Sequence, residues 1–195
     1  MVKVGIDFDS TIARLDEPWL ERLNSRLGTM YRAKDWLDWD LSFIDPSHRG
    51  AFFDLLTPDI YESVMPYPGA AEAIRRLSEE SDVELVCVTS NPSKGAEGFL
   101  NAKRRWLLKF IPELAESIIA SRSKKGLGLD VLVDDAPHHH EATDCVGVLV
   151  ERPWNAGVAA NYRFADWLDG QNLILKVISD LRSEKNGTGQ ELFRK

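Results

Sequence analysis

Apolar residues recur along the chain in short runs that are separated by segments with helical spacing. Five of these runs are strand-like: residues 2–8, 83–88, 117–120, 131–134 and 145–150. Residues 69–80 and 101–111 each place their apolar side chains on one side of a helix, and residues 172–181 predict a final packing helix. Nearly continuous apolar strands that alternate with helices predict an α/β fold with a doubly wound parallel sheet.

The alternation is interrupted between residues 15 and 66. This stretch contains no convincing strand but many aromatic residues: Trp19, Trp36, Trp39, Phe43, Phe52, Phe53 and Tyr61. Residues 17–28 and 47–64 have helical patterning, which predicts a small helical cap inserted after the first strand. The expected organisation is a core of residues 1–14 and 67–185, a cap of residues 15–66 and a flexible polar tail of residues 186–195.

Composition and charge narrow the class of protein. The 195 residues suffice for one domain with an insertion, and 44% hydrophobic residues are enough for a core. The net charge of −7 argues against a long nucleic acid as a partner. Cys87 and Cys145 lie in apolar runs and are expected to be buried, reduced thiols in core strands. No segment resembles a signal peptide or approaches membrane-spanning length, so we expect a cytoplasmic protein.

Polar side chains stand where four of the predicted strands end. In chain order they are Asp7, Asp9 and Thr11; Thr89, Ser90 and Asn91; Ser121, Arg122, Ser123, Lys124 and Lys125; and Asp134 and Asp135. In a parallel sheet all four groups face one crevice, beyond the carboxyl ends of the strands. Asp7 and Asp9 would repel each other there unless a cation lay between them. Carboxylates, hydroxyls and basic side chains together suit a magnesium ion and a phosphoryl group.

These residues resemble the motifs of the haloacid-dehalogenase-like (HAD) phosphohydrolases. Residues 7–11, DFDST, match the DxDx[TV] signature of that superfamily. Thr89, a lysine and the acidic pair Asp134 and Asp135 correspond to its three later motifs in order. Position 10 is Ser where many members have Gly. The resemblance covers residues 1 to about 153 and implies a Rossmann-like HAD core.

Within the superfamily the chain is most similar to the 5'(3')-deoxyribonucleotidases. The cap segment DWLDWDLSF, the return segment PYPGAAEAIRRL, and the spacing of Arg122 and Lys124 before Asp134 carry this resemblance. It implies a magnesium-dependent phosphatase that hydrolyses deoxyribonucleoside 5'(3')-monophosphates, and it is compatible with a homodimer.

The chemistry and the resemblance together assign a role to each motif residue. Asp7 is the expected nucleophile, which forms an aspartyl-phosphate, and Asp9 is the expected general acid and base. Mg²⁺ would bind a carboxylate oxygen of Asp7, the backbone carbonyl of Asp9, and Asp134. The other expected site residues are Lys124, which pairs with the nucleophile and the phosphate; Thr89, Ser90 and Arg122, which bind phosphate or substrate; Asp135, which supports the site; and Trp39 and Phe43, which stack on a base.

Several of these assignments have competitors. Lys125 could take the place of Lys124, Thr89 could be an ordinary turn residue, and Asp135 could cap the turn that follows it. The triplet His138, His139 and His140 fits a solvated loop better than a zinc site, because adjacent loop residues do not easily converge on one metal. The roles of Arg152 and Trp154 stay open.

Two other functions also stay open. One is a phosphatase for another small phosphomonoester or for a polynucleotide 3'-phosphate. The other is a phosphoacceptor module without turnover, such as a bacterial receiver domain, which combines acidic residues, a threonine and a lysine on a similar sheet. Receiver domains have no insertion of this size after the first strand and need no second carboxylate placed like Asp9.

Overall fold

A parallel sheet forms the centre of the computed structural model, which describes residues 1–185; the predicted flexible tail, residues 186–195, lies outside the described residues. Within this range the sheet has six strands in the order β3-β2-β1-β4-β5-β6. They are β1 (Val2–Ile6), β2 (Val83–Thr89), β3 (Ile118–Ala120), β4 (Val131–Asp134), β5 (Val146–Val150) and β6 (Arg163–Phe164). Every neighbouring pair is parallel, which confirms the predicted sheet.

Two strands differ from the sequence prediction. β1 ends at Ile6 rather than at residue 8, because the chain turns there: the amides of Ile12 and Ala13 both donate to the carbonyl of Phe8. β6 has only two residues, which is too short for an alternating pattern to reveal. It pairs with β5 and extends the sheet beyond the predicted strands.

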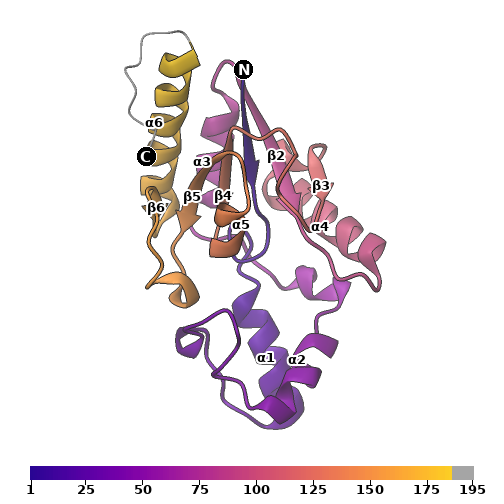
Figure 1. The fold of residues 1–195 in the computed structure, drawn as a ribbon. Coiled ribbons are helices and arrows are strands. Elements are labelled where there is room, and N and C mark those ends of the chain that lie inside the picture. The colour runs from indigo at the N-terminus through magenta and orange to yellow at the C-terminus, as the bar shows by residue number, and fades with distance from the viewer. Residues whose placement is uncertain (186–195) are drawn as a thin grey trace.

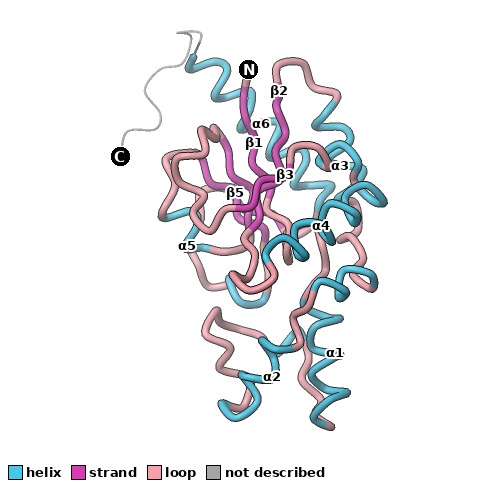
Figure 2. Tube along the Cα trace, turned by 90° about the vertical axis from the view of Figure 1, so that its right-hand side faces the viewer, coloured by secondary structure: helices cyan, strands magenta, loops and turns pink. Residues whose placement is uncertain are grey.

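Helices cover both faces of this sheet. α3 (Ala70–Ser78) and α4 (Ala96–Phe110) lie on one side of the strands, and the short α5 (Pro137–Glu141) lies on the other (Figure 2). The last helix, α6 (Trp167–Lys185), packs against α3 (Figure 1) and begins five residues before the predicted residue 172. The sheet is therefore doubly wound, as predicted.

The predicted cap residues lie beyond the carboxyl ends of the strands (Figure 1). They form two α-helices, α1 (Asp16–Leu27) and α2 (Arg49–Asp54), and three short 3₁₀ helices, η1 (Ala33–Asp35), η2 (Pro46–His48) and η3 (Pro58–Glu62). Trp19 and Phe52 hold α1 and α2 together: their rings stack with centroids 3.8 Å apart, and Trp19 Nε1 donates to the Phe52 carbonyl at 2.6 Å. The division into a core and a cap of residues 15–66 stays a prediction.

Two linkers join this helical segment to the sheet, and they run side by side. The amide of Arg14 donates to the carbonyl of Met65 at 2.9 Å, and the amide of Tyr67 donates to the carbonyl of Ile12 at 2.9 Å. Arg152 fixes the first linker, because its Nε donates to the Ser10 carbonyl at 2.6 Å while its guanidinium lies 3.7 Å from the centre of the Tyr67 ring. The linkers therefore leave and re-enter at the end of β1, where the acidic motif stands.

The two cysteines are free thiols in different environments. Cys87 is buried in β2, as predicted. The prediction is wrong for Cys145, which is half-buried and lies one residue before β5. Among the described residues, no helix combines the length and the apolar character needed to span a membrane.

Candidate active site

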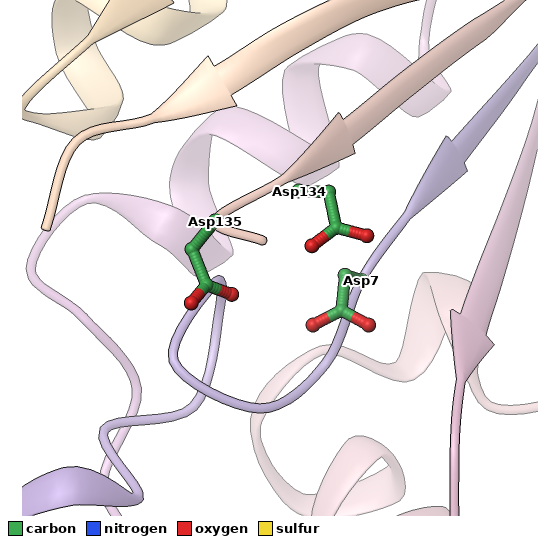
Figure 3. A group of neighbouring side chains, drawn as sticks. All are labelled: Asp7, Asp134 and Asp135. Atoms are coloured by element: carbon green, nitrogen blue, oxygen red, sulfur yellow. The ribbon is translucent and has the colours of Figure 1, made fainter. Parts of the chain in front are cut away.

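The carboxyl ends of β1 and β4 bring three carboxylates together. Asp7 follows β1, Asp134 ends β4 and Asp135 comes next, and their side chains lie near one another (Figure 3). One carboxylate oxygen of each lies within 4.8 Å of the others. The register explains the meeting, because β1 and β4 are parallel neighbours with Ile6 opposite Val133. All three residues are buried.

Lys124 neutralises part of this charge. Its buried ammonium group donates to Oδ1 of Asp7 and, at 2.6 Å, to Oδ2 of Asp134. The next residue, Lys125, has a side chain that is 62% exposed and lies 3.5 Å from Asp144. Of the two lysines that the sequence left in competition, the structure brings Lys124 to the carboxylates.

The carboxylates still outnumber the cations that touch them. Burial raises the pKa of Asp7 to about 6, although Lys124 opposes that rise. Burial also raises the pKa of Asp135, and the neighbouring Asp134 adds to this effect. At Asp134 the effect of burial is overcome by Lys124 and His139, which hold its pKa below the usual range. A raised carboxyl pKa shows that a further cation would stabilise the ionised site.

The donor set fits a hard divalent cation. Asp7 and Asp134 offer buried carboxylate oxygens, the ligands that Mg²⁺ prefers. Asp135 is committed elsewhere: its Oδ1 accepts the Thr11 hydroxyl and its Oδ2 accepts the Trp154 indole N–H, both at 2.9 Å. Asp135 thus ties the turn after β1 to the segment after β5, and its supporting role in the site stays a prediction.

Asp9 is not a member of the cluster of three carboxylates. Its Oδ1 accepts the hydroxyl of Tyr61 at 2.8 Å, and its Oδ2 accepts the ammonium group of Lys103 at 2.5 Å. Lys103 also donates to the hydroxyl of Thr89 at 2.6 Å and to the carbonyl of Ser90 at 3.1 Å. Asp9 thus lines the same cavity as Asp7 and Asp134, while Lys103 and Tyr61 hold its two carboxylate oxygens.

Sequence reasoning missed Lys103 and Tyr61. A signal for Lys103 was present, since the buried positions of α4 are Phe99, Ala102, Lys103, Trp106 and Leu107. A lysine on the apolar stripe of a helix is unusual, because a buried ammonium group requires a partner. Tyr61 carried no such signal, since it was one of many aromatic residues in the predicted cap.

The remaining predicted phosphate-binding residues lie around the same crevice. Thr89 is buried and its hydroxyl accepts a hydrogen bond from Lys103, whereas Ser90 is exposed and lines a cavity with many aromatic side chains. Arg122 is also exposed, lines that cavity, and donates to the hydroxyl of Ser93. Ser90 and Arg122 are thus accessible to a ligand, and Thr89 is part of the Lys103 network.

A cavity of about 630 Å³ opens above the carboxylates. Its aromatic lining consists of Trp19, Trp36, Trp39, Phe52, Phe53, Tyr61 and Trp154. Trp39 is 50% exposed at this cavity, and its ring lies 4.9 Å from that of His138. Phe43, the other predicted stacking residue, is not among the lining residues; it stacks on Trp36 with centroids 5.5 Å apart, and Trp36 faces the cavity instead.

The histidine triplet is helical and not a solvated loop, which corrects the sequence prediction. His138, His139 and His140 belong to α5, which Pro137 begins. His139 Nδ1 lies 2.8 Å from Oδ2 of Asp134, and His140 Nε2 lies 3.0 Å from the Asp134 carbonyl. Within residues 1–185 the cluster of potential metal ligands contains only carboxylates, and two of the three histidines contact Asp134.

Comparison with known proteins agrees with this geometry. Residues 1–180 match the model of a family described as "5' nucleotidase, deoxy (Pyrimidine), cytosolic type C protein". The chain is 22% identical over 173 residues to a 5'(3')-deoxyribonucleotidase of Bacillus subtilis, an alignment that covers 88% of this chain and 98% of the relative. It is 25% identical over 173 residues to a 5'(3')-deoxyribonucleotidase of Clostridium acetobutylicum, covering 87% and 93%.

Solved structures show the same fold. A HAD family hydrolase from Deinococcus radiodurans, whose crystal structure holds phosphate and sodium, superposes with a TM-score of 0.61 at 15% sequence identity. The match covers 90% of this chain and 95% of that one. At this identity the likeness concerns the fold.

Proposed function

Because the chain belongs to the 5' nucleotidase, deoxy (pyrimidine), cytosolic type C family, and is thus a phosphomonoester hydrolase of the HAD superfamily, we propose that it hydrolyses deoxyribonucleoside 5'- and 3'-monophosphates with Mg²⁺. One observation carries the proposal: the buried carboxylate of Asp7, held by Lys124, stands at the bottom of a cavity lined with aromatic side chains. The position supplies a nucleophile for phosphorus, and the lining supplies a surface for a base.

Asp7 is the proposed nucleophile. Lys124 donates to its Oδ1, while Oδ2 accepts no hydrogen bond from the described residues and is the oxygen we assign to attack. When Oδ2 bonds to phosphorus, the bond between phosphorus and the ester oxygen breaks, and an aspartyl-phosphate forms. Lys124 lowers the repulsion between the two anions, and a bound Mg²⁺ would lower it further by neutralising charge on the phosphate. Asp7 and Asp134 are the side chains that would hold this ion.

Asp9 is the proposed proton carrier. In the first step its carboxyl group donates a proton to the departing ester oxygen. In the second step its carboxylate takes a proton from water, the water oxygen attacks phosphorus, and the bond to Asp7 breaks, which releases phosphate and restores both aspartates. Such acid and base catalysis typically contributes about 10²–10⁴-fold to the rate. Lys103 and Tyr61 hold the carboxyl group of Asp9, which lines the same cavity as Asp7.

The cavity favours a nucleotide as the substrate. Its volume of about 630 Å³ is in the range of small-molecule sites. Stacking of a base on an aromatic side chain is worth about 1–3 kcal/mol, and a sugar phosphate gains little from such a surface. An apolar rim also favours deoxyribose, which lacks the 2'-hydroxyl. We further propose that the enzyme acts in the cytoplasm, whereas a homodimer stays a prediction.

A phosphate-release panel tests the proposed function. Wild-type protein with Mg²⁺ is expected to hydrolyse deoxynucleoside monophosphates faster than ribonucleotides, sugar phosphates, phosphoserine and 3'-phosphorylated oligonucleotides. Asp7→Asn and excess EDTA should each abolish release. A preference for sugar phosphates or oligonucleotide ends would reject the nucleotidase proposal and leave a phosphatase. Retained turnover in Asp7→Asn would reject the covalent mechanism.

A further inference from the structure

Each carboxylate oxygen of Asp9 accepts a hydrogen bond, and one of the two donors comes from the predicted cap. Lys103 approaches Oδ2 from α4, and Tyr61 approaches Oδ1 from η3 at 2.8 Å. Each carboxylate oxygen has two lone-pair positions, so one donor on each oxygen still leaves room for a substrate or a water. The two donors together define the plane of the carboxyl group.

Tyr61 is held rigidly although η3 belongs to the predicted cap. Tyr61 is 4% exposed, and its ring meets the ring of Phe8 edge-on with centroids 5.6 Å apart. The segment around it is fastened to α4 of the core, since Trp106 Nε1 donates to the Val64 carbonyl at 2.8 Å. Pro58 lies so close to Gly98 of α4 that a Cβ there would come within 3.2 Å of it. The hydroxyl of Tyr61 therefore has little freedom to leave Asp9.

We propose that Tyr61 is a positioning residue, which holds the Asp9 carboxyl group at the angle required to protonate the leaving oxygen of the substrate. This inference rests on the proposed function, in which Asp9 is the general acid. Lys103 alone fixes one oxygen and leaves the carboxyl group free to rotate about that contact. The second hydrogen bond, from Tyr61, removes this rotation, and proton transfer depends strongly on such alignment.

The ratio of the rates for two substrates with different leaving groups tests this role, because a purely structural role of Tyr61 would not change that ratio. Phenyl phosphate and p-nitrophenyl phosphate have nearly the same shape, but p-nitrophenolate is a much weaker base and departs without being protonated. Loss of phosphate binding or of cap packing lowers the rate for both substrates equally. Loss of a well-placed acid lowers the rate for phenyl phosphate more, because its leaving oxygen needs the proton.

The experiment compares kcat/KM for these two substrates in Mg²⁺ among wild type, Tyr61→Phe, Asp9→Asn and Tyr67→Phe. Tyr67 is the matched control: it is a half-buried tyrosine of the same region, its hydroxyl donates to Asp16 at 3.1 Å, and it does not touch Asp9. Removal of the Tyr61 hydroxyl should lower kcat/KM for phenyl phosphate about tenfold relative to p-nitrophenyl phosphate, the effect of one hydrogen bond to a charged group. Tyr67→Phe should leave the ratio unchanged.

The outcomes separate this inference from the proposed function. Equal losses for both substrates in Tyr61→Phe, with a changed ratio in Asp9→Asn, would overturn the role of Tyr61 and keep Asp9 as the acid. An unchanged ratio in Asp9→Asn would overturn the acid assignment itself. The same wild-type preparation is assayed with a deoxynucleoside monophosphate, and failure to hydrolyse that substrate in Mg²⁺ would overturn the proposed function. A selective loss in Tyr61→Phe that Tyr67→Phe does not share would support the inference.

Discussion

The ammonium group of Lys103 lies 2.5 Å from Oδ2 of Asp9, although the two residues are 94 positions apart in the chain. Lys103 is fully buried in α4, and it also reaches the hydroxyl of Thr89 at the end of β2. One lysine thus connects the carboxyl ends of two neighbouring strands. Because it bonds to the carboxyl group that carries the proton, its removal should affect the chemistry more than the fold.

Lys103→Met should lower kcat about a hundredfold or more, because Asp9 would keep only its bond to Tyr61. The side chain of Asp9 is 29% exposed, so water can solvate its charge and the variant should fold. Steady-state kinetics and circular dichroism measure the two effects. Lys109→Met on the exposed side of the same helix is the control and should behave as wild type. Near-normal turnover in Lys103→Met would remove Lys103 from the site.

The adjacent lysines 124 and 125 make a second matched pair. Lys124→Met should lose about 10²–10³-fold in kcat, the usual effect of removing a preorganised donor from a developing charge, because Lys124 binds Asp7 and Asp134. Lys125→Met should remain close to wild type, since the Lys125 side chain is largely exposed and forms only a loose pair with Asp144. The comparison uses kcat with one deoxynucleotide at saturating Mg²⁺. An equal decrease of kcat in both variants would mean that the buried contacts of Lys124 do not contribute to catalysis.

Stability should depend jointly on pH and Mg²⁺. Asp7 has a folded-state pKa of about 6 against an ordinary value of 3.8, so its ionisation in the folded state opposes folding. This penalty is absent below the unfolded value, grows as the pH rises, and is complete above about 6. Mg²⁺ bound to the ionised carboxylate should relieve it.

The rise in Tm on adding Mg²⁺ should therefore be largest above pH 6 and should shrink as the pH falls through 6 toward 3.8. Differential scanning fluorimetry across this range, with and without Mg²⁺, measures it. Asp134→Asn, which lacks one carboxylate ligand, should show a smaller rise at every pH. A Mg²⁺ effect of the same size at all pH values would argue that Asp7 does not bind the ion.

Trp39 should contribute to the recognition of the base. Trp39→Ala should raise KM for a deoxynucleotide at least about fivefold, which corresponds to the lower end of stacking energies, and should change KM for p-nitrophenyl phosphate less. Leu37→Ala is the control, because Leu37 is 67% exposed in the same loop and does not line the cavity. If both substrates responded equally to Trp39→Ala, the tryptophan would be a part of the cap and not a base contact.

Local patterns in the sequence were enough to predict the parallel sheet and the position of the acidic residues at one edge of it. Apolar runs that alternate with helices specify a parallel sheet, and parallel strands bring their carboxyl ends to one edge whatever the side chains are. Asp7, Thr89 and Asp134 stand at such ends, so their place at one edge of the sheet follows from the parallel pattern. No comparable rule predicts where the side chains of the cap lie, because a short helical insertion can pack in many ways.

Only the tertiary structure decided which side chains complete the site. Lys124 and Lys125 are adjacent, and packing alone turned the first toward Asp7. Lys103 and Tyr61 reach Asp9 across 94 and 52 positions of the chain. Trp36 faces the cavity while Phe43 packs behind it. In irregular segments and on helices, the direction of a side chain depends on contacts with residues that are distant in the chain, because buried charges need partners and buried rings need packing neighbours. No periodic pattern in the sequence predicts those contacts.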